Sequence, residues 1–187
     1  YDGLNSKILN YIKINNKYFK IAWIQTLKHS PVNLRPLLFV PTGCNPKGMG
    51  LFLASNVAIY KKTSNPENLK KCKMLAEWLI DHSEKKFTGS CWGYNFDWQS
   101  RTFFIPKNTP TIVNTAFIGH AFLDLFNITK EKKNLEIAAS ACKFIKNDLN
   151  VQKIKSGKIC FSYTPIDKSK IHNANLLGAS LLSRVSQ

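Results

Sequence analysis

Two helical segments that repeat 66 positions apart constrain the fold of this chain more than any other feature. The segments 66–83 and 130–148 each carry five apolar residues at the spacing i, i+3, i+6, i+7 and i+10. This spacing places the five residues on one face of an α-helix. Asn65-Pro66 and Thr129-Lys130-Glu131 supply side chains that begin helices. The sequence therefore predicts two equivalent amphipathic helices.

A second set of segments, apolar on most faces, recurs at offsets of 66 and 59. At the offset of 66, the residues that correspond to Phe117, Leu125 and Phe126 are Leu51, Ile59 and Tyr60. At the offset of 59, six residues of the later segment (Asn173, Leu176, Leu177, Gly178, Leu181 and Leu182) correspond to Asn114, Phe117, Ile118, Gly119, Phe122 and Leu123. We therefore predict equivalent helices over 110–127 and 171–185. A helix that is apolar on most faces is buried, so these form an inner layer. The Lys-rich helices 66–83 and 130–148 then form an outer ring.

The loops between these helices also correspond to one another. Residues 89–94 resemble 157–163, with the Cys and Tyr each shifted by 69 positions. Variable loops between constant helices are typical of solenoids and toroids. We predict an all-α single domain over 1–187, an incomplete α/α toroid of about three helical hairpins with almost no sheet. Because the chain begins at Tyr1 rather than Met, we expect a fragment of a longer chain.

The N-terminal part carries a weaker helical pattern. Residues 6–14 and 16–29 are predicted to be helical, and 37–40, between two prolines, extended or briefly helical. No run approaches 18 uninterrupted apolar residues, so no membrane span is predicted.

The net charge of +16 has two interpretations. It is compatible with nucleic-acid binding, but the lysines are scattered over helical segments and arginines are few, which favours solvated helix faces. We therefore expect no nucleic-acid partner, while the charge would attract acidic polysaccharides. Five cysteines, an odd number, do not indicate a disulfide framework, so a reducing cytoplasm is expected.

The segment 91–104 is the most unusual stretch, because six aromatic residues alternate there with polar ones. Sugar rings stack on aromatic faces and bind amide, carboxylate and guanidinium groups through their hydroxyls. We therefore predict that Trp92, Trp98 and Arg101 bind substrate. The alternative is an aromatic plug that folds back over the end of the toroid.

Candidate catalytic carboxylates lie in two corresponding loops. Asp97 lies between aromatic residues, whose desolvation would raise its pKa towards general-acid use; alternatively it pairs with Arg101. Asp167 could be its partner, since glycoside hydrolysis needs two carboxylates. Asp124 is expected to form a helix cap or a salt bridge. Acids are few, which weakens the prediction of a glycosidase.

Proton transfer at a sugar carbon would need further groups. His172 opens a helix and, with Tyr94 or Tyr163, could abstract or return a proton; a buried, hydrogen-bonded histidine is the alternative. Tyr163 and Asn173 are predicted to contact substrate, although Asn173, like Asn114, could instead cap a helix or form buried hydrogen bonds.

The recurring cysteines do not by themselves predict a metal site, because their spacing is not that of metal ligands. Cys44, Cys91 and Cys160 fall in corresponding loops, but no C-x-x-C or H-x-x-x-H spacing is present. No glycine-rich phosphate loop is present either. We predict no metal and no cofactor.

The repeated hairpins, the Trp92-Gly93-Tyr94 loop and the His172-Asn173-Ala174-Asn175 helix start together resemble the six-hairpin (α/α) toroid superfamily. Its members include glycosidases, polysaccharide lyases and sugar epimerases such as the N-acylglucosamine 2-epimerases. More narrowly, Cys91 to Arg101 followed by Thr109-Pro110-Thr111 looks like uncharacterised toroid proteins of bacterial polysaccharide-biosynthesis regions. The resemblance implies a sugar cleft at one end of the toroid.

These observations predict a carbohydrate-active or glycan-binding protein of polysaccharide metabolism, whose partner is an oligosaccharide or polysaccharide, possibly acidic. If it is an enzyme, the resemblance implies a sugar epimerase, a lyase or a glycoside hydrolase. The alternative is a non-catalytic helical-repeat scaffold or interaction domain.

Overall fold

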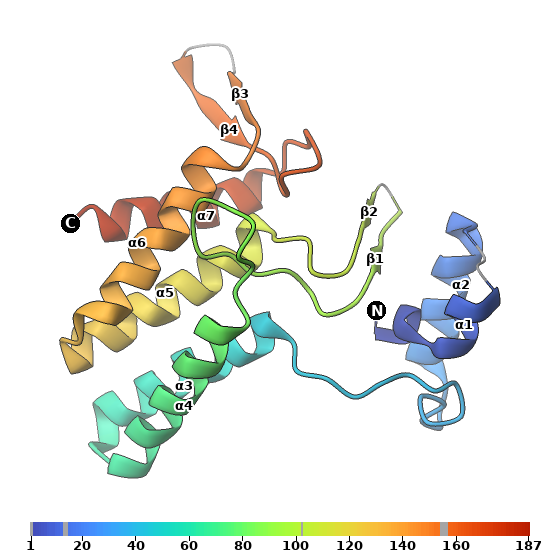
Figure 1. The fold of residues 1–187 in the computed structure, drawn as a ribbon, viewed down its shortest axis with the longest axis horizontal. Coiled ribbons are helices and arrows are strands. Elements are labelled where there is room, and N and C mark those ends of the chain that lie inside the picture. The colour runs from blue at the N-terminus through green and yellow to red at the C-terminus, as the bar shows by residue number, and fades with distance from the viewer. Residues whose placement is uncertain (1, 13–14, 102, 154–156) are drawn as a thin grey trace. The chain divides into compact units, whose positions relative to one another are not determined.

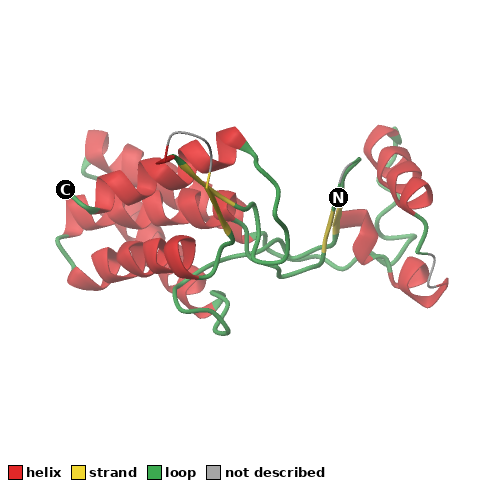
Figure 2. Cartoon of the chain, turned by 90° about the horizontal axis from the view of Figure 1, so that it is seen from above, coloured by secondary structure: helices red, strands yellow, loops and turns green. Residues whose placement is uncertain are grey.

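The computed structural model describes residues 2–12, 15–101, 103–153 and 157–187, and these are mostly helical (Figure 1, Figure 2). The sequence predicts one domain, and the contacts divide the chain into two compact units. Residues 1–44 with 94–109 make up the N-terminal unit, and residues 45–93 with 110–187 make up the helical unit. Each is described by itself.

The helical unit is built from paired helices. Helix α3 (Pro46–Thr63) pairs with α4 (Pro66–Asp81), and α5 (Ile112–Thr129) pairs with α6 (Lys132–Asn147). Helix α5 also packs against α3 and against α7 (His172–Val185), so α3, α5 and α7 follow one another as neighbours (Figure 1). The predicted helices and their pairing are confirmed. Closure into a toroid stays a prediction.

The repeat extends to the turns that end the first helix of each pair. Ser64 ends α3 with φ 52° and donates its backbone N–H to Tyr60. Lys130 ends α5 with φ 57° and donates to Phe126. Both pairs are related by the offset of 66 found in the sequence. The same left-handed turn therefore connects both hairpins.

Close packing of α3, α5 and α7 depends on one glycine in each. A Cβ added at Gly50 would lie 2.6 Å from a side-chain carbon of Ile118, and one at Gly119 would lie 2.5 Å from Leu181. At Gly178 the nearest atom would be 2.6 Å away. The glycines allow the helices to approach one another more closely than larger residues would.

Burial differs between the predicted inner helices. Helix α5 is largely buried, including Ala116, Ile118 and Phe122. In α7 only Ala174, Gly178 and Leu181 are buried, and Leu176 is 70% exposed. The prediction that 171–185 is a buried inner helix is therefore wrong, because only one face of α7 is buried, against α5, α6 and β4.

Helix α5 is long and apolar enough to cross a membrane by length and composition alone, and it is the one such helix among the described residues. More than half of it is buried inside the helical unit. The core helix of a globular unit has the same length and composition.

Two short hairpins are present that the sequence did not predict. Strand β1 (Trp98–Gln99) pairs antiparallel with β2 (Phe104–Ile105) in the N-terminal unit. Strand β3 (Val151–Lys153) pairs with β4 (Ile159–Phe161) in the helical unit. Strands of two or three residues are too short to show the alternating pattern that indicates a strand.

The N-terminal unit has a small core. A 3₁₀ helix, η1 (Asp2–Asn5), precedes α1 (Lys7–Ile12) and α2 (Lys17–His29). Leu4, Leu9 and Ile24 are buried together, with Trp23 packed against them. Of the segment 37–40, predicted to be extended or briefly helical, residues 37–39 belong to a turn over 35–39 in which Phe39 has φ 50°.

Candidate functional site

Aromatic side chains pack on one another around the β1–β2 hairpin. The rings of Tyr94 and Phe96 are stacked with centroids 5.2 Å apart, and Trp98 meets Tyr94 and Phe103 edge-on at 5.4 and 5.3 Å. Aromatic pairs of this kind stabilise by about 0.5–1.5 kcal/mol beyond their buried area. The aromatic residues therefore hold the hairpin together in addition to any role in binding.

A cavity of about 380 Å³ lies between this hairpin and α2, and we call it the hairpin cavity. Its lining residues are Ile21, Ile24, Gln25, Trp98, Gln99, Ser100 and Arg101. The amide of Gln99 is fixed, since its Nε2 donates to the carbonyls of Ser100 and Phe103 at 2.8 and 3.3 Å. Arg101 is exposed. The cavity thus combines an indole, two amides and a guanidinium.

Asp97, the predicted general acid, lies at the base of the hairpin. Its Oδ1 accepts a hydrogen bond from the backbone N–H of Lys107 at 2.7 Å. Within the described residues it forms no ion pair with Arg101. Asp97 therefore joins the two arms of the hairpin, which leaves Arg101 available to a ligand.

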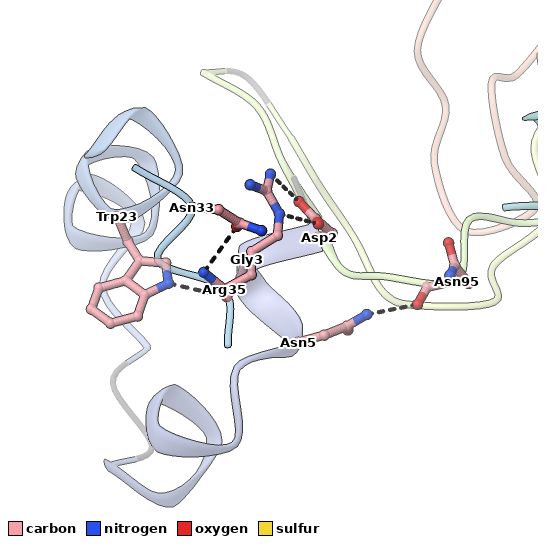
Figure 3. Close-up of polar contacts among 7 residues, drawn as sticks. All are labelled: Asp2, Gly3, Asn5, Trp23, Asn33, Arg35 and Asn95. Carbon is pink, nitrogen blue, oxygen red and sulfur yellow. Dashed lines mark hydrogen bonds and ion pairs between the residues drawn. The ribbon is translucent and has the colours of Figure 1, made fainter. Parts of the chain in front are cut away.

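A second cavity, of about 510 Å³, lies beside η1 and the end of α2, and we call it the Arg35 cavity. Arg35 makes a two-pronged ion pair with Asp2, with Nε–Oδ2 at 2.6 Å and Nη2–Oδ1 at 3.1 Å (Figure 3). The hydrogen bond from Arg35 lowers the pKa of Asp2, with a smaller opposing effect of burial. Trp23 donates its indole N–H to the carbonyl of Gly3 at 3.0 Å. The Trp23 bond joins η1 to α2, and the ion pair joins η1 to the turn that follows α2.

Trp92, predicted to bind substrate, is a core residue of the helical unit. Its side chain is completely buried, and its indole N–H donates to the carbonyl of Leu79 at 2.7 Å. Its ring stacks on Phe122 with centroids 6.3 Å apart. This corrects the sequence interpretation, because a completely buried indole offers no face to a sugar.

Asp167 organises the loop that follows β4. It accepts hydrogen bonds from the backbone N–H groups and hydroxyls of Thr164 and Ser169, and from the backbone of Tyr163. Burial acts to raise the pKa of Asp167, but the hydrogen bonds from Ser169 and Thr164 outweigh it, so this pKa lies below its usual value. A carboxylate held ionised in this way is unsuited to act as a general acid. Tyr163 is itself buried, and its carbonyl accepts from Ile112.

His172 and Asn173 are the first two residues of α7, and both are exposed. Asn173 accepts from the backbone of Ala174 at 2.9 Å. The sequence missed Asn175, whose side chain forms two 2.7 Å hydrogen bonds with the backbone of Phe161 and so joins α7 to β4. Asn114, the counterpart of Asn173, is completely buried, and neither polar atom of its side chain has a partner in the described part of the chain.

A polar cluster that the sequence only partly predicted joins α5 to α7. Arg184 donates to Asp124 at 2.6 Å, which confirms that Asp124 forms a salt bridge. The other arm of the guanidinium lies 2.9 Å from His120 Nδ1. Burial and the neighbouring Arg184 charge lower the pKa of His120, with Asp124 and a Leu177 backbone hydrogen bond opposing.

We expect the helical unit to lose stability as the pH falls below 6.5, the usual pKa of histidine. Because the pKa of His120 is lowered by folding, the unfolded chain takes up this proton first. Stability from neutral His120 is present above 6.5 and is lost as the pH falls through the folded pKa. NMR titration of the His120 ring, repeated in urea, measures both values. A folded pKa equal to or above the value in urea would contradict the prediction.

The structure divides the predicted site residues between the two units. Tyr94, Asp97, Trp98 and Arg101 lie together in the N-terminal unit, while Trp92, Tyr163, Asp167, His172 and Asn173 lie in the helical unit. A single cleft that contains both sets stays a prediction. Over the described ranges, no group of three or more His, Cys, Asp or Glu side chains is placed to hold a metal ion.

Comparison with known proteins assigns the chain to no family. No protein-family model and no curated protein sequence matches the chain.

Proposed function

We propose that this protein binds a glycan in the hairpin cavity of its N-terminal unit. The observation that carries the proposal is the lining of that cavity by Trp98, Gln99 and Arg101 together with Gln25 of α2. A sugar ring presents C–H groups to an aromatic face and hydroxyls to amides. A volume of about 380 Å³ falls in the range of small-molecule sites, roughly 300–1,000 Å³.

The charges of the chain favour an acidic glycan. Arg101 is exposed at the hairpin cavity, and Lys107 lies two residues after β2, with its backbone bonded to Asp97. The net charge of +16 attracts polyanions over a longer range. Acidic polysaccharides therefore fit both the local and the overall charge.

Binding is favoured over catalysis by the states of the two candidate carboxylates. Asp167 is saturated with hydrogen bonds and has a lowered pKa, and Asp97 holds the hairpin arms together. Neither is positioned as a free general acid. We accordingly propose a glycan-binding protein of polysaccharide metabolism. The paired helices α3–α4 and α5–α6 with α7 would form part of an α/α toroid.

Replacement of Trp98 by alanine should weaken binding of a hexamer of galacturonic acid by roughly 1–3 kcal/mol, the value of one large aromatic face. Calorimetric titration measures the change. Trp78→Ala is the matched control, since Trp78 lies on α4 of the helical unit, stacked on His82.

Because Trp98 also packs on Tyr94 and Phe103, its loss can disturb the hairpin. Arg101→Gln, at an exposed position, removes a charge without removing packing, and it should weaken binding as well. Unchanged affinity in both variants, with the N-terminal unit folded, would contradict the proposal.

A further inference from the structure

The hairpin cavity and the Arg35 cavity share two wall residues. Both are lined by Ile24 and Gln25 of α2. Ile24 is buried in the small core, whereas Gln25 is exposed. The two cavities therefore lie on either side of one exposed amide. In the described part of the chain the side chain of Gln25 forms no hydrogen bond, so it is available to a ligand that passes from one cavity to the other.

Each cavity carries a cationic group that a ligand can reach. The hairpin cavity has Arg101, and the Arg35 cavity has Lys28 and Arg35. Asp2 neutralises part of the charge of Arg35 but engages only its Nε and Nη2. Nη1 of Arg35 forms no hydrogen bond within the described residues. Lys28 is exposed and forms no ion pair within the described ranges.

The walls of the Arg35 cavity are otherwise of mixed character. Leu27, Pro31 and Val32 supply apolar surface, and Ser30 and Asn33 supply polar groups. Its volume of about 510 Å³ also lies in the range of small-molecule sites. Apolar walls with a few polar groups and a cation fit a second acidic sugar ring, of the same chemistry as the ring proposed for the hairpin cavity.

We infer that the two cavities form one groove across Gln25 that binds an acidic oligosaccharide. One carboxylate of the ligand binds Arg101, and another, further along the chain, binds Lys28 and Nη1 of Arg35. The Gln25 amide binds hydroxyls between them. This inference rests on the proposed function, and it adds that affinity depends on the length of the ligand, because a single ring fills only one cavity.

The four tryptophans of the chain make the test specific. The Trp98 indole lines the hairpin cavity, and the Trp23 indole donates to Gly3, which lines the Arg35 cavity. Trp78 and Trp92 lie in the helical unit and serve as internal controls. Indole N–H signals in a ¹⁵N NMR spectrum of the full chain are assigned by single Trp→Phe variants. The probes are galacturonic acid, its hexamer, and maltohexaose as the neutral hexamer.

We expect the acidic hexamer to shift the Trp98 and Trp23 signals together, with one affinity, whereas the monomer shifts either signal only at higher concentration. The hexamer should bind at least about tenfold more tightly than the monomer, since the second contact is made within one complex. Lys28→Gln should remove most of that gain. Lys17→Gln, at the opposite end of α2, is the matched control and should retain the gain.

The outcomes separate the two proposals. If monomer and hexamer bind equally and shift only Trp98, the glycan site stands and the groove is overturned. If maltohexaose binds as tightly as the acidic hexamer and shifts both signals, the acidic class is overturned. If no probe shifts Trp98 or Trp23, the proposed function is overturned together with the groove.

Discussion

Replacement of Trp92 by alanine should lower the free energy of unfolding of the helical unit by about 3–5 kcal/mol. The side chain is completely buried and stacked on Phe122. Its loss removes the largest buried side chain and leaves a cavity that α4 and α5 cannot fill without moving. The carbonyl of Leu79 also loses its 2.7 Å bond from the indole, and an unpaired buried polar group costs about 1–3 kcal/mol more.

Urea denaturation followed by circular dichroism measures this effect. Trp78→Ala is again a suitable control, because Trp78 is only half-buried, and it should cost much less. Trp92→Phe separates the two contributions, since it keeps most of the ring volume and removes the N–H donor. A Trp92→Ala variant that unfolds at the same urea concentration as the unchanged protein would show that Trp92 is not part of the core.

Local signals predicted the helices well. Thr129, the predicted cap of α6, is instead the last residue of α5, and the N-cap of α6 is Glu131, which forms no side-chain cap hydrogen bond. At α4 the predicted cap Asn65 accepts from the backbone of Glu67 at 2.9 Å, and Asn45 accepts likewise from Lys47 at the start of α3. These bonds link residues two positions apart, so a short stretch of sequence is enough to predict them. The apolar spacing of α4, and that of α6, likewise lies within the sequence of each helix. Features set within a few residues were therefore predictable.

Burial and pairing of single side chains were not predictable in the same way. Trp92 and Trp98 lie six positions apart in one aromatic stretch, yet Trp92 is completely buried in the helical unit and Trp98 lines a cavity in the N-terminal unit. What distinguishes them is the carbonyl of Leu79 and the ring of Phe122, which come from distant parts of the chain. The local sequence shows that both residues are aromatic, but only tertiary contacts decide whether such a side chain is buried in the core or lines a cavity.

The two short hairpins and the Arg35 cavity could not be predicted from the sequence either. Strands β1 and β2 contain two residues each, too few for a periodic pattern. The ion pair between Asp2 and Arg35 joins residues 33 positions apart with no motif to connect them. The sequence predicts a helix cap or a salt bridge for Asp124, and the structure shows the salt bridge, but its partner Arg184 could not be named from the sequence.

The second large effect that we expect comes from a single added methyl group, in Gly89→Ala. Gly89 is buried against the backbone of α6: a Cβ at this position would lie 2.0 Å from the carbonyl oxygen of Ser140 and 2.5 Å from the backbone nitrogen of Phe144. Both atoms belong to a helix, so they cannot move aside without breaking its hydrogen bonds. The sequence aligned Gly89 with Gly157, but Gly157 has φ 73° and no atom within 4 Å of its Cβ position, so the two glycines serve different purposes.

The residues on both sides of Gly89 hold the same segment against α6. Thr88 donates its N–H and hydroxyl to Asp148 at 3.0 and 2.7 Å, and Ser90 donates its N–H to the hydroxyl of Ser140 at 2.9 Å. An added methyl group must push the segment away from the helix and lengthen these bonds. Overpacking alone costs typically 1–3 kcal/mol, and each lost hydrogen bond adds about 1 kcal/mol.

We therefore expect Gly89→Ala to lower the free energy of unfolding by about 3–5 kcal/mol, from the sum of overpacking and lost hydrogen bonds. Gly48→Ala is the matched control, because Gly48 lies in the first turn of α3 and the nearest atom to its Cβ position is 3.9 Å away. The control should be neutral or stabilising by up to about 1 kcal/mol, since alanine favours the helix. Urea denaturation measures both variants, and hydrogen exchange shows whether the loss is centred on α6. If Gly89→Ala were as stable as Gly48→Ala, segment 87–90 would have room to move, and its contacts with α6 would not fix the connection between α4 and α5.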